Sequence, residues 1–194
     1  MASIETIQRI LVKLKETSEI MTDLAYFSIL NQNKDVAKHV LELEEEVDSL
    51  HTELGLEVLK LREKRPEKGL LGLIQVGVAS ENIAEAATSI AELVFESSRP
   101  HPVMNVALNE ADEVVAAFKL SRTSILANQS IAELSLHDDI GVWIIAIKRR
   151  NKWYFDPDER FVLKSDDLLL IRGPPEGRDA FLSLARGVRN QTPS

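Results

Sequence analysis

The sequence predicts a protein of two parts, a helical N-terminal bundle followed by a smaller α/β domain. Over residues 4–97, apolar side chains recur at spacings of three and four residues, which is the period of an amphipathic helix. After residue 113 the apolar residues form short β-branched runs such as 142–147, which is typical of buried strands. Pro100 and Pro102 lie between the two patterns, and two prolines in three residues cannot continue a helix.

The same change of pattern sets the expected domain bounds. We expect a helical domain over residues 1–100, a linker with a short helix over 101–112 and a second domain over 113–190. The charge is divided similarly, because the first 100 residues hold 18 of the 31 acidic side chains but only 11 of the 23 basic ones. A net charge of −8 would repel a phosphate backbone, so we expect no nucleic acid as a partner.

Three long helices are predicted in the N-terminal domain, at residues 4–30, 36–64 and 70–97. Short polar breaks separate them, and long helices with short connections form an antiparallel bundle. The third helix is rich in small residues, which let another helix approach closely: Gly72, Gly77, Ala79, Ala84, Ala87 and Ala91. A three-helix bundle can also leave one face uncovered. Both features favour a homodimer.

The second domain is predicted to have the element order β-α-β-β-β-α. Together with the helical bundle, this makes the fold class of the whole chain α + α/β. The expected elements are a strand at 114–120, a helical turn at 130–134, strands at 142–147, 152–155 and 168–171, and a final helix at 180–184. Ser130 stands at the start of the helical turn and is a suitable N-cap. The second and third strands are close enough in sequence to form a hairpin across residues 149–151.

Composition and missing motifs exclude several classes of protein. The chain has no cysteine, which excludes a disulfide scaffold, a thiolate metal site and a Cys nucleophile. It has no Gly-x-Gly-x-x-Gly after a strand, no Walker phosphate loop and no Gly-x-Ser-x-Gly elbow. We therefore expect that the protein is not an enzyme.

No stretch of the sequence predicts a membrane span. The uncharged run from Gly69 to Ser80 is far shorter than the roughly 20 residues that a spanning helix needs. The first residues, Met-Ala-Ser-Ile-Glu-Thr, lack the basic and apolar regions of a signal peptide. We expect a cytoplasmic protein with no direct membrane insertion.

Several stretches of the second domain share the pattern of a known family. They are the frame Ser-x-Leu-x-x-x-Ser-Ile-x-Glu-Leu-x-Leu at 124–136, Gly141, the strand 144–147 followed by Lys-Arg-Arg, Pro157, and the run 163–173 with its central Asp-Asp. With these marks, residues 114–187 resemble the TrkA-C domain, the C-terminal half of the RCK modules that regulate potassium channels and transporters.

The resemblance to TrkA-C implies a dimer with a ligand site near its interface, where some members bind a cyclic dinucleotide. The expected ligand-binding residues are Ile145, Ile147, Lys148, Arg149, Arg150 and Pro157. Arginine suits a phosphate because its guanidinium offers a fork of two donors. The expected ligand is therefore small and anionic, a cyclic dinucleotide or another nucleotide. The alternative is an exposed basic hairpin tip that binds nothing.

The first domain carries two acidic frames, Leu-Glu-x-x-Val-Asp-x-Leu at 43–50 and Glu-x-Ile-Ala-Glu-x-Ala-x-x-Ile-Ala-Glu at 81–92. With these it resembles half of a PhoU domain, a family whose Glu-x-x-x-Asp motifs bind metal clusters. Carboxylates four residues apart share a helix face, and oxygen ligands suit Mg, Mn or Fe. The candidate divalent-metal ligands are Glu44, Asp48, Glu81 and Glu85. The alternative is a solvated charged face.

The two resemblances together imply a function. The leading hypothesis is a cytoplasmic, ligand-sensing homodimer that regulates potassium or other cation transport, with a membrane channel or transporter subunit as its partner. The alternative is a metal-binding, PhoU-like regulator of phosphate uptake or signalling. A purely structural dimerisation module is a third interpretation, and it predicts neither ligand.

Overall fold

The computed structural model of the chain describes residues 4–64, 69–96, 101–109 and 111–186. It divides into two compact units, Met1–Pro102 and Val103–Ser194. Each unit has a hydrophobic core of its own, which is the mark of a separate domain.

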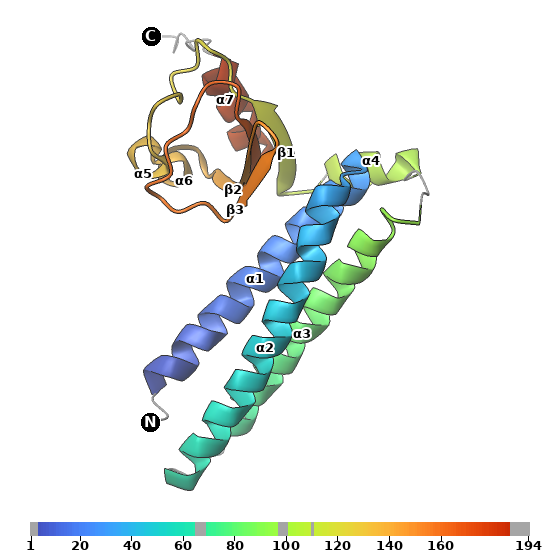
Figure 1. Cartoon of the computed structure of the whole chain (residues 1–194), viewed down its shortest axis with the longest axis vertical. Coiled ribbons are helices and arrows are strands. Elements are labelled where there is room, and N and C mark those ends of the chain that lie inside the picture. Colours follow the sequence, from blue (N-terminus) through green and yellow to red (C-terminus); the bar gives the residue numbers. More distant parts are fainter. Residues whose placement is uncertain (1–3, 65–68, 97–100, 110, 187–194) are drawn as a thin grey trace. The chain divides into compact units, whose positions relative to one another are not determined.

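The first unit is a bundle of three helices (Figure 1). Helix α1 spans Ile4–Asn31, α2 spans Lys34–Lys64 and α3 spans Leu70–Glu92, and each packs against the other two. Their apolar stripes face one another, and Leu14, Leu24 and Leu54 are among the fully buried side chains. The three-helix bundle expected from the periodicity is thus confirmed. Helix α3 ends at Glu92 rather than near residue 97, which lies outside the described residues.

The small residues of α3 form two faces rather than the single face expected. One face is buried in the bundle and consists of Gly77, Ala84, Ala87 and Ala91. The other is exposed and includes Gly72 and Ala79. A side-chain carbon added to Gly77 would lie 2.7 Å from Leu54 Cδ2 and 3.2 Å from His51 Cδ2, so it is helix α2 that uses the close approach.

The second unit is a four-stranded sheet with short helices (Figure 1). Its strands are β1 (Val114–Lys119), β2 (Trp143–Arg149), β3 (Lys152–Phe155) and β4 (Leu168–Gly173). Its helices are α4 (Pro102–Asn109) before β1, α5 (Ile131–Leu134) and α6 (Leu136–Ile140) between β1 and β2, and α7 (Pro175–Arg186) after β4.

The sheet is antiparallel throughout, with the strand order β1-β4-β2-β3. Arg149 pairs with Lys152 at the end of the predicted hairpin, which leaves Arg150 and Asn151 as the turn. Arg150, the first of the two turn residues, has φ +56°, and two-residue hairpin turns of types I′ and II′ both have a positive φ at that position. The register of β2 against β4 shifts between Ile144 and Ala146, so β2 carries an irregularity.

The core of this unit lies between one face of the sheet, the loops and α7. Helix α7 packs on β1 and β4 and inserts Phe181, whose side chain is fully buried. The buried core residues are Leu120, Leu126, Leu136, Val142, Ile147, Leu163, Leu169, Ile171, Phe181 and Ala185. They include the β-branched residues that predict the strands from sequence.

Two features of this unit differ from the expected β-α-β-β-β-α order. Helix α6 is additional, and it begins after Ser135, whose φ of +43° ends α5 and turns the chain. Helix α7 begins at Pro175 rather than near residue 180, because proline is tolerated in the first turn of a helix.

The expected N-cap at Ser130 is confirmed. Its Oγ accepts a hydrogen bond from the Glu133 amide at 3.3 Å, and a Glu133 carboxylate oxygen accepts one from the Ser130 amide at 2.8 Å. This reciprocal pair is a capping box. The hydrogen bonds from Ser130 lower the pKa of Glu133 below its usual value.

Two glycine-to-alanine changes in helices should have opposite effects on stability. Gly55 has no atom within 4 Å of an added side-chain carbon, so Gly55→Ala should stabilise the helical unit by about 0.5–1 kcal/mol. At Gly177 the added carbon would clash with the carbonyl oxygen of Ile140, so Gly177→Ala should destabilise the second unit by about 1–3 kcal/mol. Scanning calorimetry of both variants checks this, and a rise in both midpoints would contradict the close α6–α7 packing.

Candidate functional site

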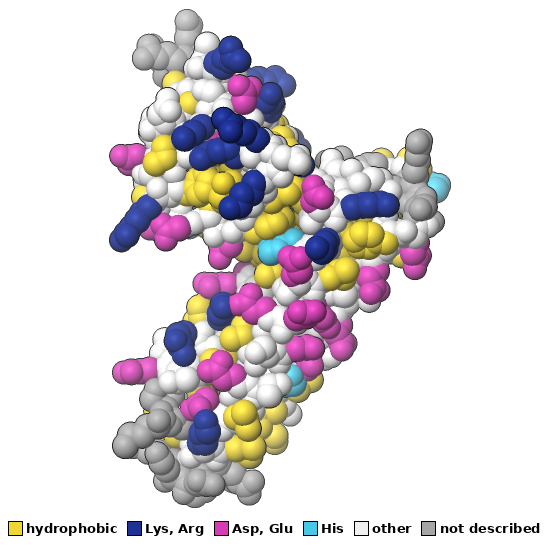
Figure 2. Space-filling view, in the orientation of Figure 1, with side chains coloured by type: hydrophobic (Ala, Val, Ile, Leu, Met, Phe, Trp, Pro, Cys, Tyr) yellow, Lys and Arg dark blue, Asp and Glu magenta, His cyan; other side chains and the backbone are white. Residues whose placement is uncertain are grey.

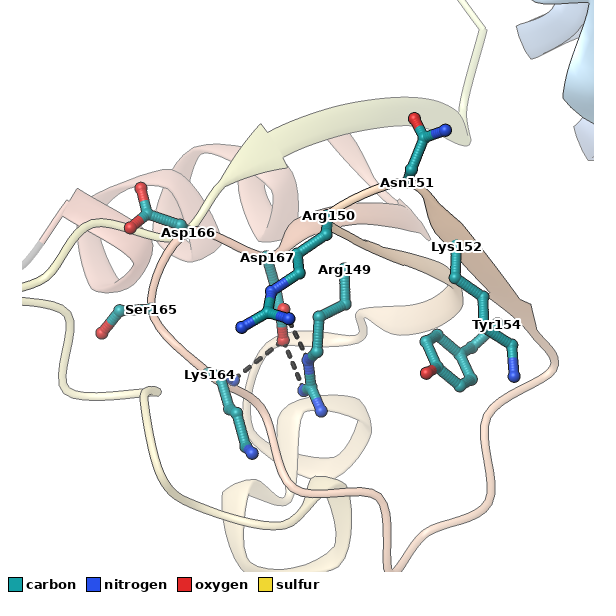
Figure 3. Close-up of a pocket in the computed structure, with 9 residues that line it drawn as sticks. All are labelled: Arg149, Arg150, Asn151, Lys152, Tyr154, Lys164, Ser165, Asp166 and Asp167. Atoms are coloured by element: carbon teal, nitrogen blue, oxygen red, sulfur yellow. Dashed lines mark hydrogen bonds and ion pairs between the residues drawn. The ribbon is translucent and has the colours of Figure 1, made fainter.

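A pocket of about 830 Å³ opens beside the β2–β3 hairpin of the second unit (Figure 3). One wall is the end of β2, the hairpin turn and β3, and the other is the loop that leads into β4. Its lining residues are Arg149, Arg150, Asn151, Lys152, Tyr154, Lys164, Ser165, Asp166 and Asp167. Four of the nine are basic and two are acidic.

A buried ion pair joins the two walls of this pocket. Arg149 donates from Nε to Asp167 Oδ1 at 2.8 Å and from Nη2 to Asp167 Oδ2 at 2.7 Å. The side chain of Asp167 is only 1% exposed and that of Arg149 is 24% exposed. A bidentate pair of this kind combines two short, charge-assisted hydrogen bonds in a fixed geometry. The hydrogen bonds to Asp167 raise the pKa of Arg149 above its usual value.

Further hydrogen bonds fix Arg149 and Asp167 in place. The same Nη2 of Arg149 donates to the carbonyl oxygen of Val162 at 2.7 Å, and its guanidinium lies 4.9 Å from the ring centroid of Phe161. The backbone amide of Lys164 donates to Asp167 Oδ2 at 2.8 Å. Nε and Nη2 of Arg149 are therefore engaged by Asp167 and Val162, which makes Arg149 a structural residue of the pocket wall.

The remaining basic side chains of the pocket are available to solvent. Arg150 extends from the hairpin turn and Lys164 from the opposite loop (Figure 3). Lys152 lies with its Nζ 4.8 Å from the ring centroid of Tyr154. Because each of these cations belongs to a different position on the rim, a ligand in the pocket would meet positive charge from several sides.

Asp166, the exposed acidic residue of the pocket, is paired with two basic side chains that are not among the lining residues. Asp166 lies 2.9 Å from Lys119 Nζ and 3.7 Å from Arg122 Nε. The hydrogen bond from Lys119 holds the pKa of Asp166 below its usual value, with a smaller contribution from Arg122. On one face of this unit Lys and Arg side chains gather around apolar ones, whereas acidic side chains are frequent along the bundle (Figure 2).

The predicted ligand residues are only partly brought together. Arg149 and Arg150 line the pocket, but Ile145 and Ile147 are 4% and 0% exposed, and Lys148 has its Nζ 5.2 Å from the ring centroid of Trp153. Those three residues and Pro157 are not among the described residues that line this pocket. The full predicted set therefore remains a prediction, and the isoleucines have too little exposed surface to serve as ligand walls in this conformation.

Sequence reasoning did not select Lys152, Tyr154 or Lys164. A signal for the first two exists, because side chains two apart on a strand share a face and Lys152 is the cross-strand partner of Arg149. Lys164 has no such local signal. It reaches the pocket through the tertiary contact between its loop and Arg149.

The predicted metal ligands are also only partly together. Burial raises the pKa of Glu44, and the nearby carboxylates of Asp48 and Glu85 raise it further. Glu81 is engaged elsewhere, since its Oε2 lies 2.8 Å from Nδ1 of His51. Among the described residues, no group of three His, Cys, Asp or Glu side chains is placed to hold a metal ion. The four-carboxylate site gains no support from this arrangement and remains a prediction.

None of the helices in the described ranges is long and apolar enough to cross a membrane.

Removing one partner of the Arg149–Asp167 pair should destabilise the second unit strongly. Asp167→Asn leaves a largely buried guanidinium without its counter-charge, and we expect a loss of about 3 kcal/mol. The double variant Arg149→Met/Asp167→Asn should recover part of that loss, because no unpaired charge remains. Denaturant unfolding of both single variants and the double variant measures the coupling. Additive effects would show that the two side chains do not act as a pair.

Glu44 should destabilise the helical unit when ionised. Its raised folded-state pKa means that the penalty is present above that pKa and disappears as the pH falls. Glu44→Gln should therefore stabilise the unit by about 0.2–0.5 kcal/mol at pH 7, the size of a like-charge pair at i,i+4, and have no effect well below pH 4. Glu53→Gln, at an exposed position of α2, is the control. A stabilisation that does not depend on pH would contradict the assignment.

Comparison with solved structures finds distant similarities. The RCK C domain of the potassium transport protein KtrA in complex with cyclic diadenosine monophosphate is 25% identical, covers 42% of this chain and 93% of its own, and has a TM-score of 0.35. The GsuK channel bound to NAD is 18% identical over 59% of this chain and 21% of its own, with a TM-score of 0.35. BusR of S. agalactiae in complex with its busAB-promotor DNA is 13% identical over 98% and 100%, with a TM-score of 0.36.

Two family models match the sequence itself, whereas a comparison with curated proteins found no match. The TrkA-C domain model matches residues 115–186, which contain the whole pocket. The PhoU domain model matches residues 11–94, which cover most of the three-helix bundle. Both resemblances stated from the sequence are confirmed. The chain therefore combines an N-terminal PhoU domain with a C-terminal TrkA-C domain.

Proposed function

We propose that this chain is a non-enzymatic regulatory protein whose TrkA-C domain binds a small phosphate-bearing ligand in the pocket beside the β2–β3 hairpin. The observation that supports it most is that the basic residues of the pocket differ in the contacts that they make. Arg149 is committed to Asp167 and Val162, while Arg150, Lys152 and Lys164 surround the open cavity. Unneutralised cations around a concave surface are the chemistry that recognises phosphate.

The size and lining of the pocket favour a nucleotide over a simple anion. A volume of about 830 Å³ lies within the range of small-molecule sites, and it is much larger than inorganic phosphate needs. Tyr154 lines the cavity, and an aromatic ring is a surface on which a base can stack. We therefore propose a nucleotide or cyclic dinucleotide as the ligand.

We further propose that the regulated process is potassium or other cation transport, with a channel or transporter subunit as the partner. TrkA-C domains belong to the RCK modules of such systems, and this membership is the support for the proposal. The described KtrA complex with cyclic diadenosine monophosphate suggests the first ligand to test. Ligand binding can regulate a partner only if it favours one conformation or assembly over another.

The ligand proposal predicts a specific thermal stabilisation of the second unit. A ligand that binds only the folded state, at 100 times its dissociation constant, adds about 2.7 kcal/mol. We expect one member of a panel of cyclic di-AMP, AMP, ATP and NADH to raise the unfolding midpoint, and inorganic phosphate to raise it much less. Differential scanning fluorimetry of the full chain measures this, and the shift should shrink as salt is added.

Matched charge variants show whether the shift arises in this pocket. Arg150→Ala/Lys164→Ala should abolish the shift, because it removes two cations that no described ion pair occupies. Arg178→Ala/Arg186→Ala removes the same charge from α7, outside the pocket, and should preserve the shift. Equal loss in both variants, or no shift with any nucleotide, would overturn the proposed function.

A further inference from the structure

Helix α3 carries an apolar seam that its own bundle covers only in part. The seam residues follow one another at spacings of four and three, and they are Gly72, Val76, Ala79, Ile83, Ala86 and Ile90. Val76 is 53% exposed and Ile83 is 48% exposed, although both are large apolar side chains. The alternating spacing is that of the a and d positions of a coiled coil, which pack against a second helix.

We propose that this α3 seam packs antiparallel against the α3 seam of a second copy of the chain. The inference is independent of the ligand pocket, which lies in the other unit. It commits to a second copy because the seam is complementary to itself, as the next two observations show.

The first observation is the alternation of residue size along the seam. Val76, Ile83 and Ile90 fall at one heptad position, and Gly72, Ala79 and Ala86 fall at the other. In an antiparallel pair the two positions face each other, so every β-branched residue meets a small one: Val76 with Ala86, Ile83 with Ala79, and Ile90 with Gly72. Layers of large against small residues fill space well. A parallel pair would place Ala79 opposite Ala79 and leave gaps.

The second observation is the charge around the seam. The residues along its open side are polar but neutral: Gln75, Asn82 and Ser89 are all exposed. The acidic residues of α3 lie on the side that faces α2, where Glu81 meets His51 and Glu85 lies near Glu44. A chain with a net charge of −8 would repel a second copy over most of its surface. The seam offers a contact without like charges, and a twofold axis uses the same patch on both copies.

Cysteine cross-linking tests the register, because the chain has no cysteine of its own. In the proposed pair Asn82 lies beside Asn82 of the second copy, so Asn82→Cys in the full chain should form a disulfide dimer under mild oxidation. Neither Gln75→Cys nor Ser89→Cys should form a disulfide dimer by itself. In the proposed register the same residue of the two copies is separated by about 18–24 Å along the helix axis, given the helical rise of about 1.5 Å per residue. A mixture of these two variants should form the mixed dimer.

Each other outcome overturns the proposal. A Gln75→Cys dimer formed without Ser89→Cys would indicate a parallel pair. Light scattering at the same protein concentration shows whether the chain is a 21.7 kDa monomer or a dimer. In either case, the absence of an Asn82→Cys disulfide dimer would show that the seams do not meet.

A second set of variants separates the seam from other contacts between copies. Ile83→Lys in the Asn82→Cys background should abolish the cross-link, because it places a charge at the centre of the seam. It should not unfold the bundle, since Ile83 is already half exposed. Leu59→Lys, at an exposed apolar position of α2, should leave the cross-link intact. Retention of the cross-link in Ile83→Lys would contradict the α3 pairing.

Discussion

The buried ion pair between Arg149 and Asp167 is the interaction on which the candidate site depends. Asp167 is almost completely inaccessible, and a buried acidic side chain is costly unless a cation and hydrogen-bond donors accompany it. Arg149 and the backbone amide of Lys164 supply them. The pair joins residues 18 positions apart in the sequence, the end of β2 and the loop before β4, and these are the two walls of the pocket.

The same pair gives the neighbouring basic residues different roles. Arg149 holds the walls together, whereas Arg150 and Lys164 line the pocket and take part in no ion pair among the described residues. The two units also differ in the chemistry that they offer to partners. The TrkA-C domain offers cations around a cavity, whereas α3 of the PhoU domain offers an uncharged apolar seam bordered by neutral side chains. Ligand recognition and association of copies would therefore depend on separate surfaces, which can be altered independently.

The sequence predicts the elements of this fold better than it predicts the site. Helices and strands follow from local periodicity, so three long helices and four strands were expected; α6 was not, because five residues after a left-handed Ser135 are too few to show a period. Arg149 and Arg150 were expected because they are adjacent in a recognisable frame. Lys164 reaches them only through tertiary structure. Ile145 was expected to contact ligand, but it lies in the run 142–147, whose β-branched pattern itself indicates burial, and its side chain is only 4% exposed.

The central claim is that the cavity beside the β2–β3 hairpin binds a phosphate-bearing ligand. Amide chemical shifts of the ¹⁵N-labelled full chain, recorded while cyclic di-AMP is titrated in, test it residue by residue. The account predicts that the largest changes fall on the hairpin turn at Arg150 and Asn151 and on the loop at Lys164 and Ser165, with helices α2 and α3 much less affected. Saturable changes confined to the acidic faces of α2 and α3, or no saturable change with cyclic di-AMP or any other nucleotide, would contradict it.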